Sequence, residues 1–148
     1  MISGRNWIYH SEYSESAHQN DVALIKLERD IPADYQVSEI YDGTGTVTSN
    51  DLTLVGYGIT NESKEDAGYL RTTVKSINDL DNDKTLARIP QRYNGICSGD
   101  SGGPAFIEIN GQLKVLGVNS FVTGSSDATV CHGYGSVSYT HLTLPTKA

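Results

Sequence analysis

The pattern of apolar and polar positions predicts short β-strands separated by turns. The runs that alternate, or that are rich in β-branched and aromatic residues, are Trp7–Tyr9, Asn20–Leu27, Leu52–Gly58, Leu70–Ile77, Ala105–Ile109 and Leu113–Val118. Asn110-Gly111, the strongest two-residue hairpin signal, separates the last two runs. No segment between residues 52 and 120 repeats its apolar positions with a helical period. The pattern therefore predicts an all-β fold, a barrel or a sandwich.

Composition narrows the class of protein. The 148 residues suffice for one substantial core, and 37% apolar with 20% charged residues is typical of a soluble globular chain. The net charge of −7 argues against nucleic acid or an anionic membrane as a partner. No apolar run has the length of a membrane span, and the first residues lack the apolar stretch of a secretion signal.

One loop carries the strongest chemical signal in the chain. In Cys97–Phe106 three glycines bracket an Asp-Ser pair, and a proline then begins an apolar run. Such a run can be an ordinary surface turn. It can also form a tight loop whose amide N–H groups converge beside a serine nucleophile, as acyl transfer requires. At average residue frequencies, Gly-Asp-Ser-Gly-Gly-Pro arises by chance in roughly one in a hundred thousand chains of this length.

A single acidic residue, Asp21, stands at the mouth of the apolar segment Asn20–Leu27. An acid at the end of a buried strand is costly unless a partner satisfies it. Two interpretations are open from the segment alone. Asp21 either caps the strand end or accepts the N–H of a histidine and fixes its tautomer.

The motif Gly99–Pro104 resembles the nucleophile motif of the chymotrypsin/trypsin-like serine proteases. Asn20–Leu27 looks like the stretch of that family that carries the triad aspartate, and His10–Tyr13 is similar to the loop before it. The resemblance implies a two-barrel, chymotrypsin-like all-β fold. Residues 1–138 would supply the end of the first barrel and most of the second.

The resemblance also implies roles for individual residues. Ser101 would be the nucleophile, the amides of Gly99 and Ser101 the oxyanion hole, and Asp21 the triad acid. Asp100 would pair with the N-terminal ammonium that zymogen cleavage releases. The function implied is hydrolysis of peptide bonds in polypeptide substrates, through an acyl-enzyme on Ser101.

The specificity pocket is expected to be small and neutral. The resemblance places Gly95 at its floor, where an aspartate would select Arg or Lys, and Val122 at its entrance, where a glycine would leave more room. Ser120, Phe121 and Val122 resemble the strand that hydrogen-bonds an extended substrate. We therefore expect a preference for small or medium apolar P1 residues.

Two cysteines, Cys97 and Cys131, are the only ones in the chain. In a cytosolic protein they would be free thiols, whereas pairing across a separation of 34 residues would imply an oxidising compartment. The resemblance favours the disulfide, and with it a secreted or periplasmic parent protein. No cofactor or metal is expected. Asp79, Asp81 and Asp83 fail the calcium-loop pattern, so we interpret them as a solvated acidic loop.

The catalytic base is the missing part of the resemblance. No Ala-Ala-His-Cys-like segment precedes Asp21, and none of the four histidines is expected to replace it. We therefore expect the chain to be an inactive C-terminal part of a protease, with residues 139–148 a non-native or disordered tail. The alternatives are a non-catalytic homologue that serves as a binding module and an unrelated β-barrel with a chance glycine loop.

Overall fold

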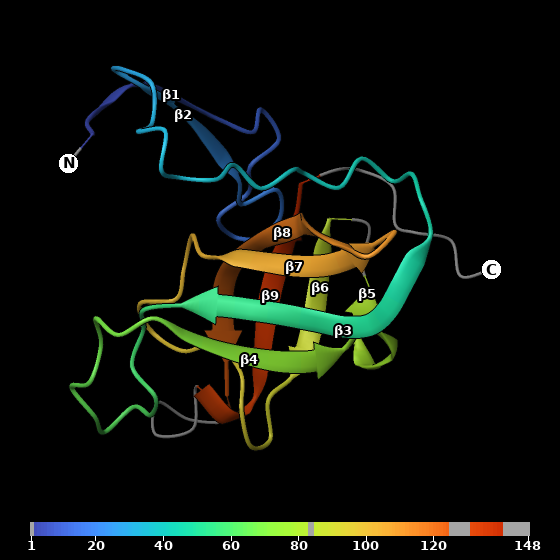
Figure 1. Cartoon of the computed structure of the whole chain (residues 1–148). Coiled ribbons are helices and arrows are strands. Elements are labelled where there is room, and N and C mark those ends of the chain that lie inside the picture. Colours follow the sequence, from blue (N-terminus) through green and yellow to red (C-terminus); the bar gives the residue numbers. More distant parts are fainter. Residues whose placement is uncertain (1, 83–84, 125–130, 141–148) are drawn as a thin grey trace.

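Nine strands arranged in two antiparallel sheets make up the fold of the computed structural model (Figure 1), which describes residues 2–82, 85–124 and 131–140. The small sheet pairs β1 (Gly4–Tyr9) with β2 (Ala23–Leu27). The large sheet has the order β4-β3-β7-β8-β9-β6-β5. Its strands are β3 (Val47–Gly56), β4 (Arg71–Ser76), β5 (Asp81–Asn82), β6 (Leu86–Pro90), β7 (Pro104–Ile109), β8 (Gln112–Thr123) and β9 (Tyr134–Tyr139). The helical residues among those described are the 3₁₀ turn η1 (Ile77–Asp79) and a short 3₁₀ stretch at residues 131–132.

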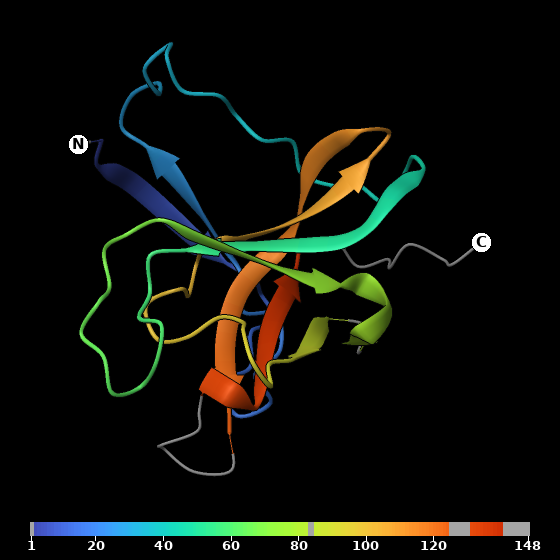
Figure 2. The same ribbon diagram turned by 60° about the horizontal axis from the view of Figure 1, so that its bottom comes forward.

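The large sheet curls into a half-barrel around a single apolar core, as Figure 2 shows from a second direction. Alternate residues of β7 point inward, so that Ala105, Ile107 and Ile109 are buried. Leu52 and Leu54 of β3 and Ile89 of β6 complete the centre of this core. The all-β expectation is therefore confirmed, and the curled sheet is consistent with part of a chymotrypsin-like fold.

The structure extends strands that the sequence predicts and adds others. β3 begins at Val47, ahead of the predicted run Leu52–Gly58, and β8 continues to Thr123. The strands β5, β6 and β9 were not predicted. The five residues of β6 end in a proline, which argues against a strand. Pro90 is tolerated there because it is the last residue of the strand.

The turn between β7 and β8 matches its prediction. Ile109 pairs with Gln112, and the two residues between them have positive φ angles of 51° at Asn110 and 80° at Gly111. Positive φ at both central positions is the geometry of a type I′ hairpin, for which Asn-Gly is favoured. The turn fixes the register that carries β8 toward the candidate site.

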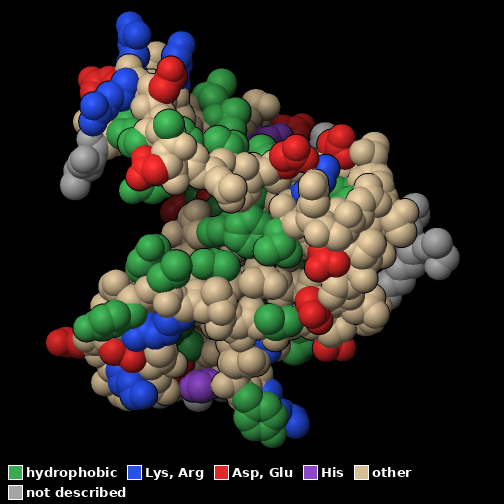
Figure 3. Space-filling view, viewed as in Figure 1, with side chains coloured by type: hydrophobic (Ala, Val, Ile, Leu, Met, Phe, Trp, Pro, Cys, Tyr) green, Lys and Arg blue, Asp and Glu red, His purple; other side chains and the backbone are tan. Residues whose placement is uncertain are grey.

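The lobe formed by β1 and β2 leaves its apolar side chains in contact with solvent. Trp7 is 75% exposed and Leu24 66%, and these strands pair only with each other. The expectation that the strand after Asp21 is buried is therefore wrong for this chain, because a two-stranded sheet on its own covers neither of its faces. Figure 3 shows hydrophobic side chains on this lobe beside a deep notch that separates it from the body.

A connector joins the lobe to the half-barrel. Glu39 and Tyr41 hydrogen-bond the backbone of Val115 in β8, at 2.8 and 2.9 Å. Lys114 also pairs with Glu39 at 2.9 Å. This contact anchors the chain between the two sheets. No helix within the described residues is long and apolar enough to cross a membrane.

The tail expected over residues 139–148 falls mostly on residues 141–148, which lie outside the described residues. Tyr139 itself ends β9 and is buried, and its N–H donates to the carbonyl of Thr85. The strand therefore reaches one residue into the stretch assigned to the tail.

Candidate active site

The loop before β7 holds Ser101 in a short series of turns. Asp100 N donates to Cys97 O at 3.1 Å, and Gly103 N donates to Asp100 O at 3.0 Å. Gly99 has φ 94°, a left-handed conformation that favours glycine. A Cβ on Gly103 would collide with the carbonyl of Val55. The glycines of the motif are therefore required by backbone geometry, and Ser101 remains exposed at the loop surface.

Ser120 brings Ser101 and Asp21 together from distant parts of the sequence. Its carbonyl accepts a hydrogen bond from Ser101 Oγ at 3.0 Å, and its own Oγ donates to Asp21 Oδ2 at 2.5 Å. Ser120 lies in β8 and is buried, so both contacts rest on a rigid strand. The structure thus places three of the predicted site residues around one point.

Three amides of the loop have no acceptor within the described residues. They are the N–H groups of Ser98, Gly99 and Ser101, whereas the N–H groups of Asp100 and Gly102 donate to backbone carbonyls. Free amides near a serine hydroxyl can stabilise negative charge on a nearby oxygen. The amides of Gly99 and Ser101 are the two donors that the resemblance assigns to the oxyanion hole.

The Asp100 side chain links its own loop to the residues that directly follow β3. Its Oδ1 accepts from Gly58 N at 2.7 Å and its Oδ2 from Cys97 N at 2.8 Å. A Cβ on Gly56 or Gly58 would collide with this carboxylate. The Gly56-Tyr57-Gly58 sequence therefore leaves the space that the carboxylate occupies.

Arg71 hydrogen-bonds the carbonyl of Gly58, the residue whose N–H contacts Asp100. Its guanidinium donates to Gly58 O at 2.9 Å and to Asp66 O at 2.7 Å, and lies 3.6 Å from the Asp66 carboxylate. Hydrogen bonds from the side chain and the backbone of Thr60 lower the pKa of Asp66, with Arg71 adding to the effect. The loop between β3 and β4 is thus ordered where it meets Asp100.

A cavity of about 400 Å³ lies beside Asp100. Its wall combines β3, the start of β4, the segment before the Ser101 loop and the Cys97–Cys131 region. Gly58, Thr72 and Asn94 line it together with Asp100. An acidic group at the edge of a cavity of this size could receive a cationic group.

The predicted pocket residues lie on the two segments that flank Ser101. Val122 of β8 is paired with Gly135 of β9 and packs against the core. Phe121 stacks on His18 with a ring-centroid distance of 4.6 Å. Gly95 lies in the segment before the nucleophile, and Gln91 fills the space beside it. The sequence analysis missed Gln91, since a single glutamine after a proline gives no signal of burial.

Cys97 and Cys131 form a disulfide, as the resemblance implied, with Cα atoms 4.9 Å apart. The bond ties the Ser101 loop to the segment before β9. It confirms the pairing and excludes free thiols at these positions.

Removing the disulfide is expected to lower the free energy of unfolding. Closing a loop of this length contributes about 3–4 kcal/mol in the chain-entropy model, so the Cys97→Ala/Cys131→Ala variant should be weaker by that amount. Urea unfolding of the variant measures the loss. Reduced wild-type protein should show the same loss, and an unchanged unfolding midpoint in both would contradict the expectation.

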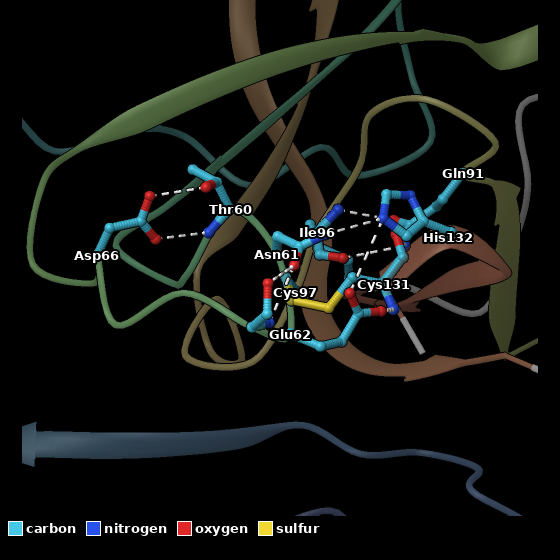
Figure 4. A network of polar contacts seen from close by, with 10 residues as sticks. Thr60, Asn61, Glu62, Asp66, Gln91, Ile96, Cys97, Cys131 and His132 are labelled. Atoms are coloured by element: carbon cyan, nitrogen blue, oxygen red, sulfur yellow. Dashed lines mark hydrogen bonds and ion pairs between the residues drawn. A yellow bond between two sulfur atoms is a disulfide. The ribbon is translucent and has the colours of Figure 1, made fainter. Parts of the chain in front are cut away.

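Glu62 connects the loop after β3 to the disulfide (Figure 4). Its Oε1 accepts from Cys131 N at 2.6 Å, and its Oε2 lies 3.8 Å from His132 Nε2, which is also 3.4 Å from Asn61 Nδ2. Backbone N–H groups, its own first and then that of Cys131, hold the pKa of Glu62 below its ordinary value of 4.5, and His132 contributes further. The ionised carboxylate therefore favours the folded state.

This shift predicts a pH dependence of stability. The contribution of Glu62 is present above pH 4.5 and is lost as the pH falls through the lower folded pKa. Glu62→Gln should therefore have a lower Tm than wild type at pH 7, with a difference that shrinks below pH 4.5. Thermal unfolding from pH 7 to pH 3 tests this, with Glu65→Gln in the same loop as the control. A difference independent of pH would contradict it.

No described histidine reaches the serine or the acid. His10 accepts from Glu12 N, His18 stacks on Phe121, and His132 lies near Glu62. His141 lies outside the described residues. The part of the chain that the structure describes also contains no group of three or more His, Cys, Asp or Glu side chains that could hold a metal.

Comparison with known proteins shows which family the chain matches. The family model described as Trypsin matches residues 1–142. A trypsin of Saccharopolyspora erythraea is 28% identical over 80% of this chain and 55% of its own length. A chymotrypsin of Phaedon cochleariae is 26% identical over 72% of this chain and 44% of its own length. Trypsin-1 of Astacus astacus is 24% identical over 89% of this chain and 61% of its own length.

The chain thus spans about half the length of the first two relatives. The family match covers every described residue, including Asp21, Ser101 and Ser120. Taken with the curled sheet and the glycine-rich serine loop, the match shows that this chain belongs to the trypsin family of serine peptidases.

Proposed function

We propose that the protein is a serine endopeptidase that cleaves polypeptides through an acyl-enzyme on Ser101. The observation that carries the proposal is the position of Ser120, which contacts Ser101 Oγ through its carbonyl and Asp21 Oδ2 through its hydroxyl. A nucleophile and a histidine-orienting acid must lie on either side of the same imidazole. Their shared contact with Ser120 supports that arrangement.

In the proposed reaction, Ser101 Oγ attacks the scissile carbonyl while an imidazole takes its proton. The negative charge that develops on the carbonyl oxygen is stabilised by the N–H groups of Gly99 and Ser101. The C–N bond then breaks, the imidazole protonates the leaving amine, and water hydrolyses the acyl-enzyme. Asp21 orients the imidazole and stays ionised.

The base itself must come from outside the described residues. None of the three described histidines hydrogen-bonds Ser101 or Asp21, and the chain spans about half the length of its first two relatives. We infer that residues 1–138 act as part of a larger protease domain that supplies the imidazole. The chain alone is then inactive toward peptides.

Asp100 is proposed to act in activation. Its carboxylate borders the cavity of about 400 Å³, and each oxygen accepts one amide N–H while retaining a second lone pair. An N-terminal ammonium that entered the cavity could pair with it and so fix the loop of Gly99 and Ser101. The disulfide supports an oxidising compartment, secreted or periplasmic, for the whole protein.

Labelling of the complete, processed gene product with a fluorophosphonate tests the proposal. The label should be found on the peptide that contains Ser101 by mass spectrometry, and Ser101→Ala should abolish it. Ser98→Ala, which changes another exposed serine of the same loop, should label like wild type. Absence of labelling at Ser101 would overturn the proposal and favour the binding-module alternative.

A further inference from the structure

Gln91 is a fully buried polar residue directly after β6. Its side chain is 0% exposed, and its backbone N–H donates to Gly133 O at 2.9 Å. The side-chain amide accepts from Ile96 N at 2.6 Å and donates to Ile96 O at 2.9 Å and Cys131 O at 3.4 Å (Figure 4). Three hydrogen bonds hold the amide in one orientation.

Two glycines make room for this amide. A Cβ on either Gly95 or Gly135 would lie far inside the 3.0 Å limit of real Cβ contacts, and in both cases the nearest atom is Gln91 Oε1. The two glycines come from opposite sides, Gly95 from the segment before the nucleophile and Gly135 from β9. Gln91 therefore occupies the space between these segments.

That space lies where the specificity pocket is expected to end. Gly135 is the cross-strand partner of Val122, which follows Ser120 and Phe121 in β8. Gly95 and Ile96 directly precede Cys97, which is held by the disulfide, and the chain then continues to Ser101. The amide of Gln91, and not a charged group, thus lies between these two segments.

We propose that Gln91 is a specificity-determining residue that sets the depth of the primary pocket. The inference rests on the proposed function and extends it to a substrate class, which is polypeptides with a short uncharged P1 side chain such as alanine or valine. Both amide hydrogens and one acceptor position of Gln91 are already used. The amide therefore acts by filling volume, and a longer P1 side chain finds no space.

Two variants distinguish the volume that the Gln91 side chain fills from the structural support that its hydrogen bonds give. Gln91→Ala removes the amide and deepens the pocket, whereas Gln91→Met keeps a side chain of similar length without hydrogen bonds. The measurement is kcat/KM of the complete, processed protein on peptides that differ only at P1, with alanine, valine, leucine and phenylalanine. We expect Gln91→Ala to raise the phenylalanine-to-alanine ratio about 10-fold or more, as a change of pocket size by one or two methylene groups can.

Gln91→Met should keep the wild-type P1 order while lowering Tm, because the hydrogen bonds are lost but the volume remains. If Gln91→Ala does not fold, Gln91→Asn shortens the same amide by one methylene and should shift the order toward leucine. An unchanged P1 order in the shortened variants, or the same change in Gln91→Met, would overturn the inference.

Fluorophosphonate labelling at Ser101 separates this outcome from failure of the proposed function. A wild-type protein that labels and cleaves but prefers phenylalanine overturns the role of Gln91 alone. A wild-type protein that neither labels nor cleaves overturns both.

Discussion

Replacing Asp21 with asparagine is expected to lower kcat for peptide hydrolysis about 10⁴-fold in the complete protein, as replacement of the triad aspartate by asparagine does in chymotrypsin-like serine proteases. The hydroxyl of Ser120 donates to Asp21 Oδ2, and it would lose this acceptor if an amide nitrogen stood in that position. An asparagine also no longer stabilises an imidazolium. Steady-state kinetics with a single peptide measures the loss.

The matched control for this change is Asp34→Asn, which removes an exposed acid from the connector between β2 and β3. It should leave kcat unchanged. Asp21→Asn should fold like wild type, since the acid is exposed. A fall in kcat of less than about tenfold, which is under 1.4 kcal/mol in the barrier, would mean that Asp21 is not the triad acid.

Gly56→Ala is expected to produce the largest loss of stability. The added Cβ would collide with Oδ1, Cγ and Cβ of Asp100, whose carboxylate is held by the N–H groups of Gly58 and Cys97. Overpacking costs about 1–3 kcal/mol and a lost charge-assisted hydrogen bond about 1.5–3 kcal/mol, so we expect about 3–5 kcal/mol in all. Urea unfolding of the chain measures it.

Gly68→Ala is the control for Gly56→Ala. Gly68 lies in the loop that follows Gly56 and leads to β4, and nothing lies within 4 Å of an added Cβ, although its φ of 98° is strained for alanine. Its cost should be about 1 kcal/mol. Equal losses in the two variants would show that the space for Asp100 is not what Gly56 provides.

Much of the site was predictable from short motifs. The loop around Ser101 requires residues that tolerate left-handed backbone angles and close approach of other atoms. Only glycine meets both requirements, so the run of glycines in the sequence predicts the loop. The Asn110-Gly111 turn was predictable for the same reason. The pairing of Cys97 with Cys131 was implied by the family resemblance.

Features that depend on long-range packing were not predictable. Gln91 is buried because two glycines, Gly95 in a loop and Gly135 in β9, leave space for it, and nothing local to it indicates this. β6 lacks a clear alternating pattern and ends in proline, so its pairing with β9 decides its conformation. The exposure of Leu24 depends on which segments cover β2, which the apolar pattern of that strand does not report.

Ser120 has a consequence for how such a protein can change over generations. Its side chain hydrogen-bonds Asp21 of the small lobe, and its backbone carbonyl accepts from Ser101 of the half-barrel. A substitution that shifts either sheet by even 1 Å would therefore alter the distance between the proposed triad acid and the proposed nucleophile, a displacement that can cost about 10²-fold in rate. Selection for activity then acts on the packing between the two sheets, so we expect substitutions in one sheet to be accompanied by compensating substitutions in the other.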